Sequence, residues 1–112
     1  MSADVAAAFS RHEFVRTYPH LAPDVRWEIV GDRVIAGRDA VVAACTESAA
    51  YLAGATTTFT RFRVVAGDGT VVVDTEARYA GPDGTATVAS CDLYDFADGR
   101  LAAIRSYTVA LP

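Results

Sequence analysis

The sequence predicts an α+β fold in which helices cover one face of a strongly bent, mainly antiparallel sheet. Three Asp-Gly pairs begin at Asp68, Asp83 and Asp98 and therefore recur every 15 residues. Asp-Gly favours tight hairpin turns because glycine readily adopts the positive φ that such turns require. The segments around these turns are rich in β-branched and aromatic residues, which favour strands. A meander of four long strands is therefore expected to follow an N-terminal half that contains the helices.

Two short helices are predicted at the N-terminus. Ser2 is a candidate N-cap for an alanine-rich helix over 3–9. Ser10 and Glu13 match a capping box, in which the serine hydroxyl and the glutamate carboxylate each satisfy a backbone donor. This pattern predicts a second helix over about 11–18.

The middle of the chain alternates between strand and helix patterns. Apolar and polar residues alternate over 24–30, which is typical of a half-buried strand, and a short extended segment follows at 33–36. A third helix is predicted over 38–53, with Gly54 as its C-cap. Its apolar stripe is expected to face the sheet and consists of Val41, Ala44, Cys45, Ser48 and Leu52. The later strands are predicted at 56–66, 70–80, 85–96 and 100–111.

Composition limits the classes of function. The chain of 112 residues suits a single domain over 1–112, and 52% of its residues are hydrophobic. Its net charge is −4 and its ten basic residues are scattered arginines, which argues against binding to nucleic acid or an acidic membrane. No membrane span or signal peptide is recognised. Cys45 and Cys91 lack metal-ligand spacing and suit a reducing compartment. We expect a cytoplasmic protein that uses neither metal nor cofactor.

Several segments resemble the nuclear-transport-factor-2-like (NTF2-like) superfamily, and within it the SnoaL-like branch. They are Asp24–Glu28, the helix start at Gly37–Val41, Ser90–Leu101 and Ile104–Tyr107. The resemblance covers nearly the whole chain and implies a cystatin-like, cone-shaped fold. Its members include ketosteroid isomerases, polyketide cyclases, epoxide hydrolases, dehydratases and non-catalytic binding modules. The resemblance therefore implies a small-molecule pocket without specifying one reaction.

Individual positions separate these activities. Asp92 lies where ketosteroid isomerases place the acid of their oxyanion hole, and Tyr94 supplies the aromatic residue that follows it. The general-base aspartate of those enzymes would fall near Ile29 and their oxyanion tyrosine near Val5, and both are missing. Epoxide hydrolases of the limonene type need an Asp-Arg-Asp relay, and this chain has Thr108 where an acidic residue is expected. Neither complete mechanism is implied.

The pleat of the predicted hairpins assigns side chains to two faces. Across the second turn, Val73 pairs with Asp92. At the third turn, a two-residue loop would place Asp92 beside Arg105, whereas a three-residue loop with a bulge would place it beside Ile104. We favour the bulge. The enclosed face then carries Trp27, Ile29, Val73, Thr75, Val88, Ser90, Asp92, Tyr94, Ile104, Ser106 and Thr108.

The opposite face is expected to be a surface of mixed charge. Its charged residues are Arg61, Arg63, Asp74, Glu76, Arg78 and Arg105. Its apolar residues are Val72, Leu93, Tyr107 and Val109. Because such a face is poorly suited to full solvation, we expect a homodimer through it. His12 and His20 are expected at the surface, with His20 near the rim of the cavity.

Asp92 is the principal candidate site residue. A carboxyl on the enclosed face is costly to bury in its ionised form, so its pKa is expected to rise unless Arg105 pairs with it. One hypothesis is a cofactor-free isomerase, cyclase or hydratase that uses Asp92 as proton donor or acceptor on a cyclic, largely apolar substrate. The alternative is a non-catalytic ligand-binding or dimeric interaction module in which Asp92 is structural. Candidate ligand-binding residues are Trp27, Tyr51, Thr75, Ser90, Tyr94, Ile104 and Ser106.

Overall fold

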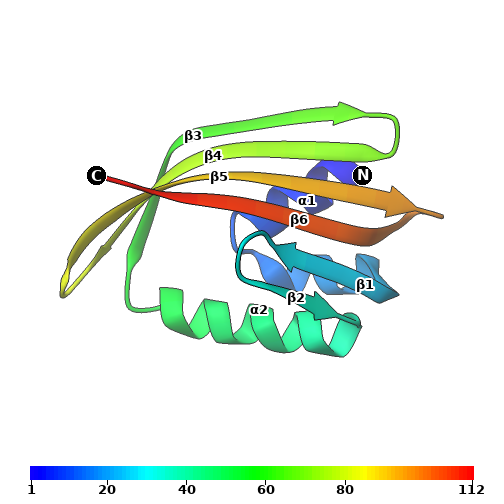
Figure 1. The fold of residues 1–112 in the computed structure, drawn as a ribbon, viewed down its shortest axis with the longest axis horizontal. Coiled ribbons are helices and arrows are strands. Elements are labelled where there is room, and N and C mark those ends of the chain that lie inside the picture. Colours follow the sequence, from blue (N-terminus) through cyan, green and yellow to red (C-terminus); the bar gives the residue numbers. More distant parts are fainter.

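A computed structural model describes residues 1–112 and confirms the α+β fold (Figure 1). The order of elements agrees with the sequence prediction, except that the second helix is a 3-10 helix, η1. The helices are α1 (Ser2–Ser10), η1 (Phe14–His20) and α2 (Arg38–Leu52). The strands are β1 (Leu21–Ile29), β2 (Arg33–Ala36), β3 (Thr56–Gly67), β4 (Thr70–Gly81), β5 (Gly84–Ala97) and β6 (Arg100–Leu111).

One six-stranded sheet organises the molecule. Its strand order is β2-β1-β6-β5-β4-β3, and β1 runs parallel to β6 while all other neighbours are antiparallel. The four long strands bend together, so that the β4–β5 hairpin curls toward the end of α2 (Figure 1). This bend creates a concave face that the helices cover at one end only.

The two α-helices cover different parts of the concave face. α1 packs against β3, β4 and β5, whereas α2 packs against β1, β2 and η1. The predicted 38–53 helix, α2, therefore covers the β1–β2 end of the sheet, whereas α1 covers the long strands. Val41, Ala44 and Cys45 of the predicted stripe are buried. The C-cap of α2 is Ala53 rather than Gly54.

The capping-box prediction is also wrong, because Ser10 and Glu13 flank the end of a helix. α1 begins at Ser2, with Met1 as its N-cap. At its other end, the Glu13 N–H donates to the Ala8 carbonyl at 2.9 Å and the His12 N–H donates to Phe9 at 3.0 Å. His12 has a φ of 68°. These bonds and the left-handed residue define a Schellman motif. Ser10 is thereby placed on the last turn of α1, facing the sheet.

The hydrophobic core lies at the closed end, between the helices and the inner face of the sheet. Phe9 is its centre, with edge-to-face ring contacts at centroid distances of 5.0 Å to Phe14, 5.0 Å to Trp27 and 5.8 Å to Tyr94. Such aromatic pairs add to the free energy gained from area burial. The opposite end of the concave face has no equivalent filling.

The register of β5 and β6 differs from both alternatives that the sequence left open. Asp98 and Gly99 form a two-residue turn with φ values of 53° and 75°, as a type I′ hairpin requires. A bulge in β6 between Leu101 and Ala103 then shifts the register, so that Asp92 lies opposite Ser106. The bulge was expected in the turn itself. Because it restores the same alternation, the predicted division into two faces holds.

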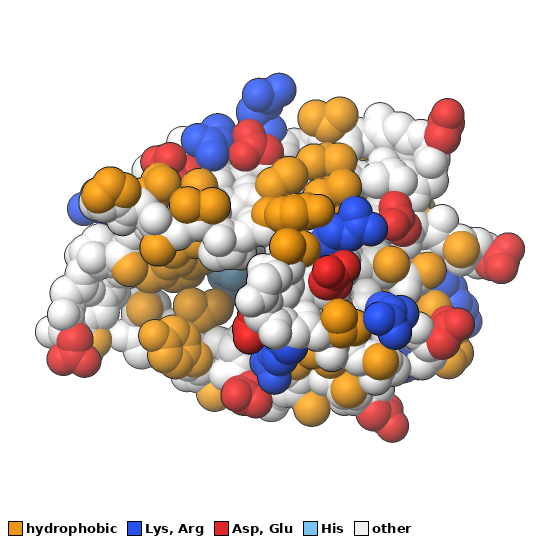
Figure 2. Space-filling view, in the orientation of Figure 1, with side chains coloured by type: hydrophobic (Ala, Val, Ile, Leu, Met, Phe, Trp, Pro, Cys, Tyr) orange, Lys and Arg blue, Asp and Glu red, His pale blue; other side chains and the backbone are white.

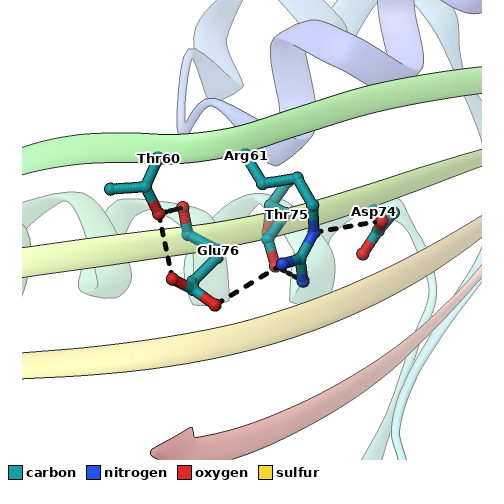
Figure 3. A network of polar contacts seen from close by, with 5 residues as sticks. All are labelled: Thr60, Arg61, Asp74, Thr75 and Glu76. Atoms are coloured by element: carbon teal, nitrogen blue, oxygen red, sulfur yellow. Dashed lines mark hydrogen bonds and ion pairs between the residues drawn. The ribbon is translucent and has the colours of Figure 1, made fainter.

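The outer face carries the expected mixture of charges. Arg61 Nε lies 3.1 Å from Asp74 Oδ2, and Arg61 Nη1 lies 3.4 Å from Glu76 Oε1 (Figure 3). Arg105 belongs to this face and lies 3.6 Å from Glu28, so it does not pair with Asp92. None of the helices combines the length and apolar character needed to cross a membrane.

Candidate functional site

A cavity of about 980 Å³ occupies the open end of the concave face. Figure 2 shows the hollow between the sheet and the helix below it, with a histidine side chain inside. Apolar wall residues include Phe9, Phe14, Trp27, Ile29, Ala44, Leu52, Ala86 and Val88. Polar and charged wall residues include Ser10, His12, Arg33, Glu47, Ser48, Tyr79, Asp83, Ser90, Asp92, Ser106 and Thr108. A pocket of this size, whose exposed wall is mainly apolar by area and carries several polar groups, suits a small organic molecule.

Asp92 reaches the cavity from β5, where the pleat turns it inward. Ser10 Oγ donates to its Oδ2 at 2.9 Å, and the Tyr94 hydroxyl lies 3.5 Å from the same oxygen. Ser10 Oγ and the Tyr94 hydroxyl are only 2.6 Å apart. Each hydroxyl has a single hydrogen to donate. When Asp92 is ionised, the distances therefore favour a chain in which Tyr94 donates to Ser10 and Ser10 donates to Asp92.

A third hydroxyl reaches Asp92 from the neighbouring strand. The Trp27 indole N–H donates to Ser106 Oγ at 3.0 Å. Because indole is only a donor, Ser106 must accept this bond and keeps its own hydrogen for another partner. Ser106 lies opposite Asp92 in the β5–β6 register and acts as a hydrogen-bond partner that lowers the pKa of Asp92. Neutral hydroxyl groups, rather than a cation, hold this carboxyl.

Burial dominates the electrostatics of the site. It raises the pKa of Asp92, and the hydrogen bonds from Ser106, Ser10 and Tyr94 only partly oppose that rise. The sequence predicts this direction. Burial and the neighbouring Asp92 charge also raise the pKa of Tyr94 well above its ordinary value, so Tyr94 remains a neutral hydroxyl. Asp92 is therefore the group here that can gain or lose a proton.

A second polar pair lies on the cavity wall. His12 Nε2 is 3.2 Å from the Tyr79 hydroxyl. Burial lowers the pKa of His12, so its imidazole is mainly neutral at pH 7. Burial and the Asp92 charge raise the pKa of Tyr79. The expectation of a surface position is wrong for His12, and His20, expected near the rim, is not among the lining residues.

The structure divides the predicted ligand-binding residues into two groups. Trp27, Tyr51, Ser90 and Ser106 line the cavity together with Asp92. Tyr51 lies at its rim, with 86% of its surface exposed. Three other predicted residues belong to the buried core and do not line the cavity: Thr75, Tyr94 and Ile104. Tyr94 still contributes through Ser10.

Sequence reasoning missed several cavity residues, among them Tyr79, Ser10 and His12, and Tyr79 left a usable signal. Tyr79 shares strand parity with Val73, so the pleat already places it on the enclosed face. Ser10 and His12 gave no such signal, because their positions depend on where α1 ends and how it packs against the sheet. No group of three or more His, Cys, Asp and Glu side chains is arranged to hold a metal ion.

Solved structures with the same fold include an NTF2-like protein of unknown function from Cytophaga hutchinsonii. Its TM-score is 0.84 at 27% identity, over 95% of this chain and 94% of the other. A limonene-epoxide-hydrolase-like epoxide hydrolase from Mycobacterium tuberculosis has a TM-score of 0.68 at 18% identity, over 96% and 78%. A proposed SnoaL-like polyketide cyclase from Mesorhizobium loti has a TM-score of 0.69 at 12% identity, over 93% and 92%.

The last two similarities are low in identity and support the fold alone. A comparison with curated proteins finds no significant match. The profile of the SnoaL-like domain matches residues 3–104, which is most of the chain. The protein therefore belongs to the SnoaL-like domain family, within the NTF2-like superfamily.

Proposed function

We propose that this protein binds a cyclic, largely apolar small molecule in its cavity and that Asp92 transfers a proton to or from that molecule without a cofactor. The observation that carries the proposal is a carboxyl inside an apolar cavity whose pKa is raised by burial and whose partners are neutral hydroxyl groups. A raised pKa brings a carboxyl closer to neutrality, where general acids and bases are most effective. Membership of a family with cyclase-like and hydrolase-like relatives is consistent with it.

The chemistry would be a proton shuttle on carbon next to a carbonyl. Ionised Asp92 removes a proton from the carbon, the electron pair of the C–H bond forms a new C=C bond, and the C=O π pair moves onto the oxygen to give an enolate. Protonated Asp92 then returns the proton to the same or another carbon, so the enzyme ends in its starting state. Ser10 donates to the carboxylate while it is charged and therefore holds its position during the exchange.

A probe ketone tests this proposal without knowledge of the natural substrate. We suggest 2-tetralone, a bicyclic ketone with acidic α-hydrogens. Its binding should quench the fluorescence of Trp27, because Trp27 is the single tryptophan of the chain and lines the cavity. In D₂O, the wild-type protein should accelerate exchange of the α-hydrogens, measured by proton NMR.

The decisive variant is Asp92→Asn. It keeps the shape of the side chain but removes proton transfer, so exchange should fall about 100-fold or more while the Kd changes less than about threefold. Asp95→Asn is the matched control, because Asp95 lies on the same strand, is exposed and bonds to Thr70 on the outer face. Exchange that is equally fast in Asp92→Asn and wild type would contradict a catalytic Asp92.

A non-catalytic binding module is the second candidate. The favouring observation is that the Asp92 carboxyl accepts hydrogen bonds from Ser10 of α1 and Tyr94 of β5, so it also ties these elements together. If 2-tetralone quenches Trp27 but the wild-type protein leaves its exchange rate at that of buffer, the binding module is the better account.

We also propose that the outer face of the sheet pairs two copies of the chain. Apolar side chains are exposed there beside the charged ones, among them Val65, Tyr107 and Val109, which are 54%, 43% and 59% exposed. Analytical ultracentrifugation at tens of micromolar, a rough working threshold for weak dimers, should give a dimer. A monomer at that concentration would contradict this assembly.

A further inference from the structure

The end of α1 contains a residue that its backbone does not favour. His12 occupies the C′ position of the Schellman motif with a φ of 68°. Glycine is the usual residue at that position, because a side chain makes the left-handed conformation costly. Five glycines of the chain have a positive φ, and apart from His12 the only other residue with a positive φ is Asp98, in the β5–β6 turn. A non-glycine residue held in this conformation at a cavity wall points to a role for its side chain.

The imidazole lies on the cavity wall among aromatic rings. Its ring centroid is 5.7 Å from Phe14, 6.0 Å from Phe59 and 6.1 Å from Tyr79. Its polar contact within the protein is the 3.2 Å hydrogen bond to the Tyr79 hydroxyl. Both partners line the cavity, so their remaining hydrogen-bonding capacity is available to a bound molecule.

The number of hydrogen atoms that this pair can donate to a ligand does not depend on the tautomer of His12. A neutral imidazole has one N–H and a tyrosine has one O–H, and the bond between them uses one of these two hydrogens. If Tyr79 donates to Nε2, then the Nδ1–H of His12 is left as a donor. If Nε2–H donates, the Tyr79 O–H is left. In both cases one donor hydrogen and at least one tyrosine lone pair remain, a combination that a hydroxyl group matches because it donates and accepts.

The His12–Tyr79 pair and Asp92 lie at separate positions on the wall of one cavity. Asp92 lies opposite Val73 and Ser106, whereas Tyr79 lies opposite Ala86, nearer the β4–β5 turn. The sheet bends between these positions, and the Tyr79 hydroxyl is close enough for the Asp92 charge to affect it. A molecule in the cavity can therefore contact Asp92 and the His12–Tyr79 pair with different atoms.

We propose that His12 and Tyr79 bind a hydroxyl group of the substrate, which narrows the substrate class to cyclic molecules that carry one carbonyl for Asp92 and a separate alcohol or phenol. The inference rests on the proposed function for the carbonyl at Asp92. It adds that the second oxygen fixes the orientation in which the reacting carbon meets Asp92. His12 and Tyr79 are positioning residues, since they bind the substrate away from the reacting atoms.

Ring-hydroxylated probes test the inference by affinity. Trp27 fluorescence titrations would compare 2-tetralone with its 5-, 6-, 7- and 8-hydroxy isomers, which place the phenol at different distances from the ketone. At least one isomer should bind the wild-type protein about tenfold more tightly than 2-tetralone, which is the size of one good neutral hydrogen bond. The same isomer should also show the larger ratio of exchange rate to Kd.

Two variants and one control test whether the tighter binding of that isomer depends on His12 and Tyr79. Tyr79→Phe should bring the isomer to within about threefold of 2-tetralone, while the affinity for 2-tetralone itself changes less than about twofold. His12→Gly should do the same and still fold, because glycine is the preferred residue at C′. Tyr107→Phe, which removes a hydroxyl from the outer face, should leave every affinity unchanged.

The outcomes separate the inference from the proposed function. The proposed binding of a hydroxyl group by His12 and Tyr79 is wrong if no isomer binds more tightly than 2-tetralone, or if the tighter binding persists in Tyr79→Phe. This holds even when exchange depends on Asp92. If the tighter binding of the isomer depends on Tyr79 but the wild-type protein exchanges no hydrogens, the proposed catalysis is wrong. The binding of a hydroxyl group by His12 and Tyr79 is then still supported. If Tyr79→Phe weakens all probes equally, the pair has only a structural role and the inference is overturned.

Discussion

The two faces of the long strands hold carboxyl groups in opposite ways. On the outer face, Asp74 and Glu76 lie in water beside the Arg61 guanidinium, at 3.1 and 3.4 Å. On the inner face, Asp92 is directed into an apolar cavity and is held by hydroxyl groups. Asp74 pairs with Cys91 and Val73 pairs with Asp92, so the two kinds of carboxyl belong to adjacent positions of the same strand pair.

The pleat, rather than the residue type, decides what an aspartate does here. One step along a strand moves a side chain from a solvated ion pair to a desolvated cavity. An ion pair in water keeps a carboxyl charged and contributes little to stability. A buried carboxyl without a cation binds its proton more readily and is able to exchange it with a ligand.

The largest effect expected from this comparison concerns packing. Val73 is fully buried on the inner face, so Val73→Ala should lower the free energy of unfolding by about 2–3 kcal/mol through lost burial and the cavity left behind. Val65 is 54% exposed on the outer face, and Val65→Ala is the matched control, with an expected loss below about 0.5 kcal/mol. Urea unfolding measures both. Similar losses of unfolding free energy in the two variants would contradict the difference in burial between the two faces.

The next effect concerns the link from α1 to the inner carboxyl. Ser10→Ala removes the hydroxyl that bonds to both Asp92 and Tyr94, and should cost about 1–2 kcal/mol of unfolding free energy. It should also raise the pKa of Asp92 further, because this bond stabilises the carboxylate. Ser90→Ala is the control, since Ser90 lines the same cavity. If Ser10→Ala and Ser90→Ala change the unfolding free energy and the pKa of Asp92 equally, the Ser10 hydroxyl does not support Asp92.

The pH dependence of stability should separate Asp92 from an asparagine at the same site. The folded pKa of Asp92 is raised above the ordinary value of 3.8, so the unfolded chain releases this proton at lower pH than the folded chain. Wild-type stability relative to Asp92→Asn should therefore fall as pH rises above about 3.8 and become constant once the folded carboxyl is ionised. Thermal unfolding of both proteins from pH 3 to 8 measures this difference. A relative stability that increases over this range has the wrong sign for the account.

The smallest expected effect lies on the outer face. Arg61→Gln should lower the free energy of unfolding by at most about 1 kcal/mol, because its partners are partly exposed and screened by solvent. The effect should shrink further in 1 M salt. Arg63→Gln, whose exposed side chain lies on the same strand and face, is the control. A salt-independent loss of several kcal/mol would show that this network is buried, for example in an assembly.

Much of the fold was predictable because it depends on local rules. The Asp-Gly pairs mark all three hairpins, with Asp68-Gly69 and Asp98-Gly99 as the turn residues of two and Pro82-Asp83 as those of the third. The alternation of side chains fixes which residues share a face with Asp92. The exact partner of Asp92 was not predictable, because a bulge in β6 leaves no clear mark in a run of alanines and branched residues. The register error was harmless to the faces, since the bulge keeps the parity that was expected from the turn.

The candidate site was predictable only in its strand residues. Asp92, Ser90, Ser106 and Trp27 follow from the pleat, but Ser10 and His12 come from a helix end that meets the sheet through tertiary packing. The Ser10–Glu13 spacing is compatible with a helix start, and only the Schellman bonds show that a helix ends there. His12, which was expected at the surface, is therefore a titratable cavity residue that sequence reasoning missed.

The titration of Asp92 shows whether this carboxyl can carry a proton in the cavity. Carbon-13 NMR of the side-chain carboxyl, assigned through Asp92→Asn, follows this group alone from pH 2.5 to 8 in the ligand-free protein. We expect a midpoint above the ordinary 3.8, and a higher midpoint still in Ser10→Ala. A midpoint at or below 3.8 in the wild-type protein would mean that Asp92 is a solvated or ion-paired carboxylate like those of the outer face, and would contradict its role as a proton carrier.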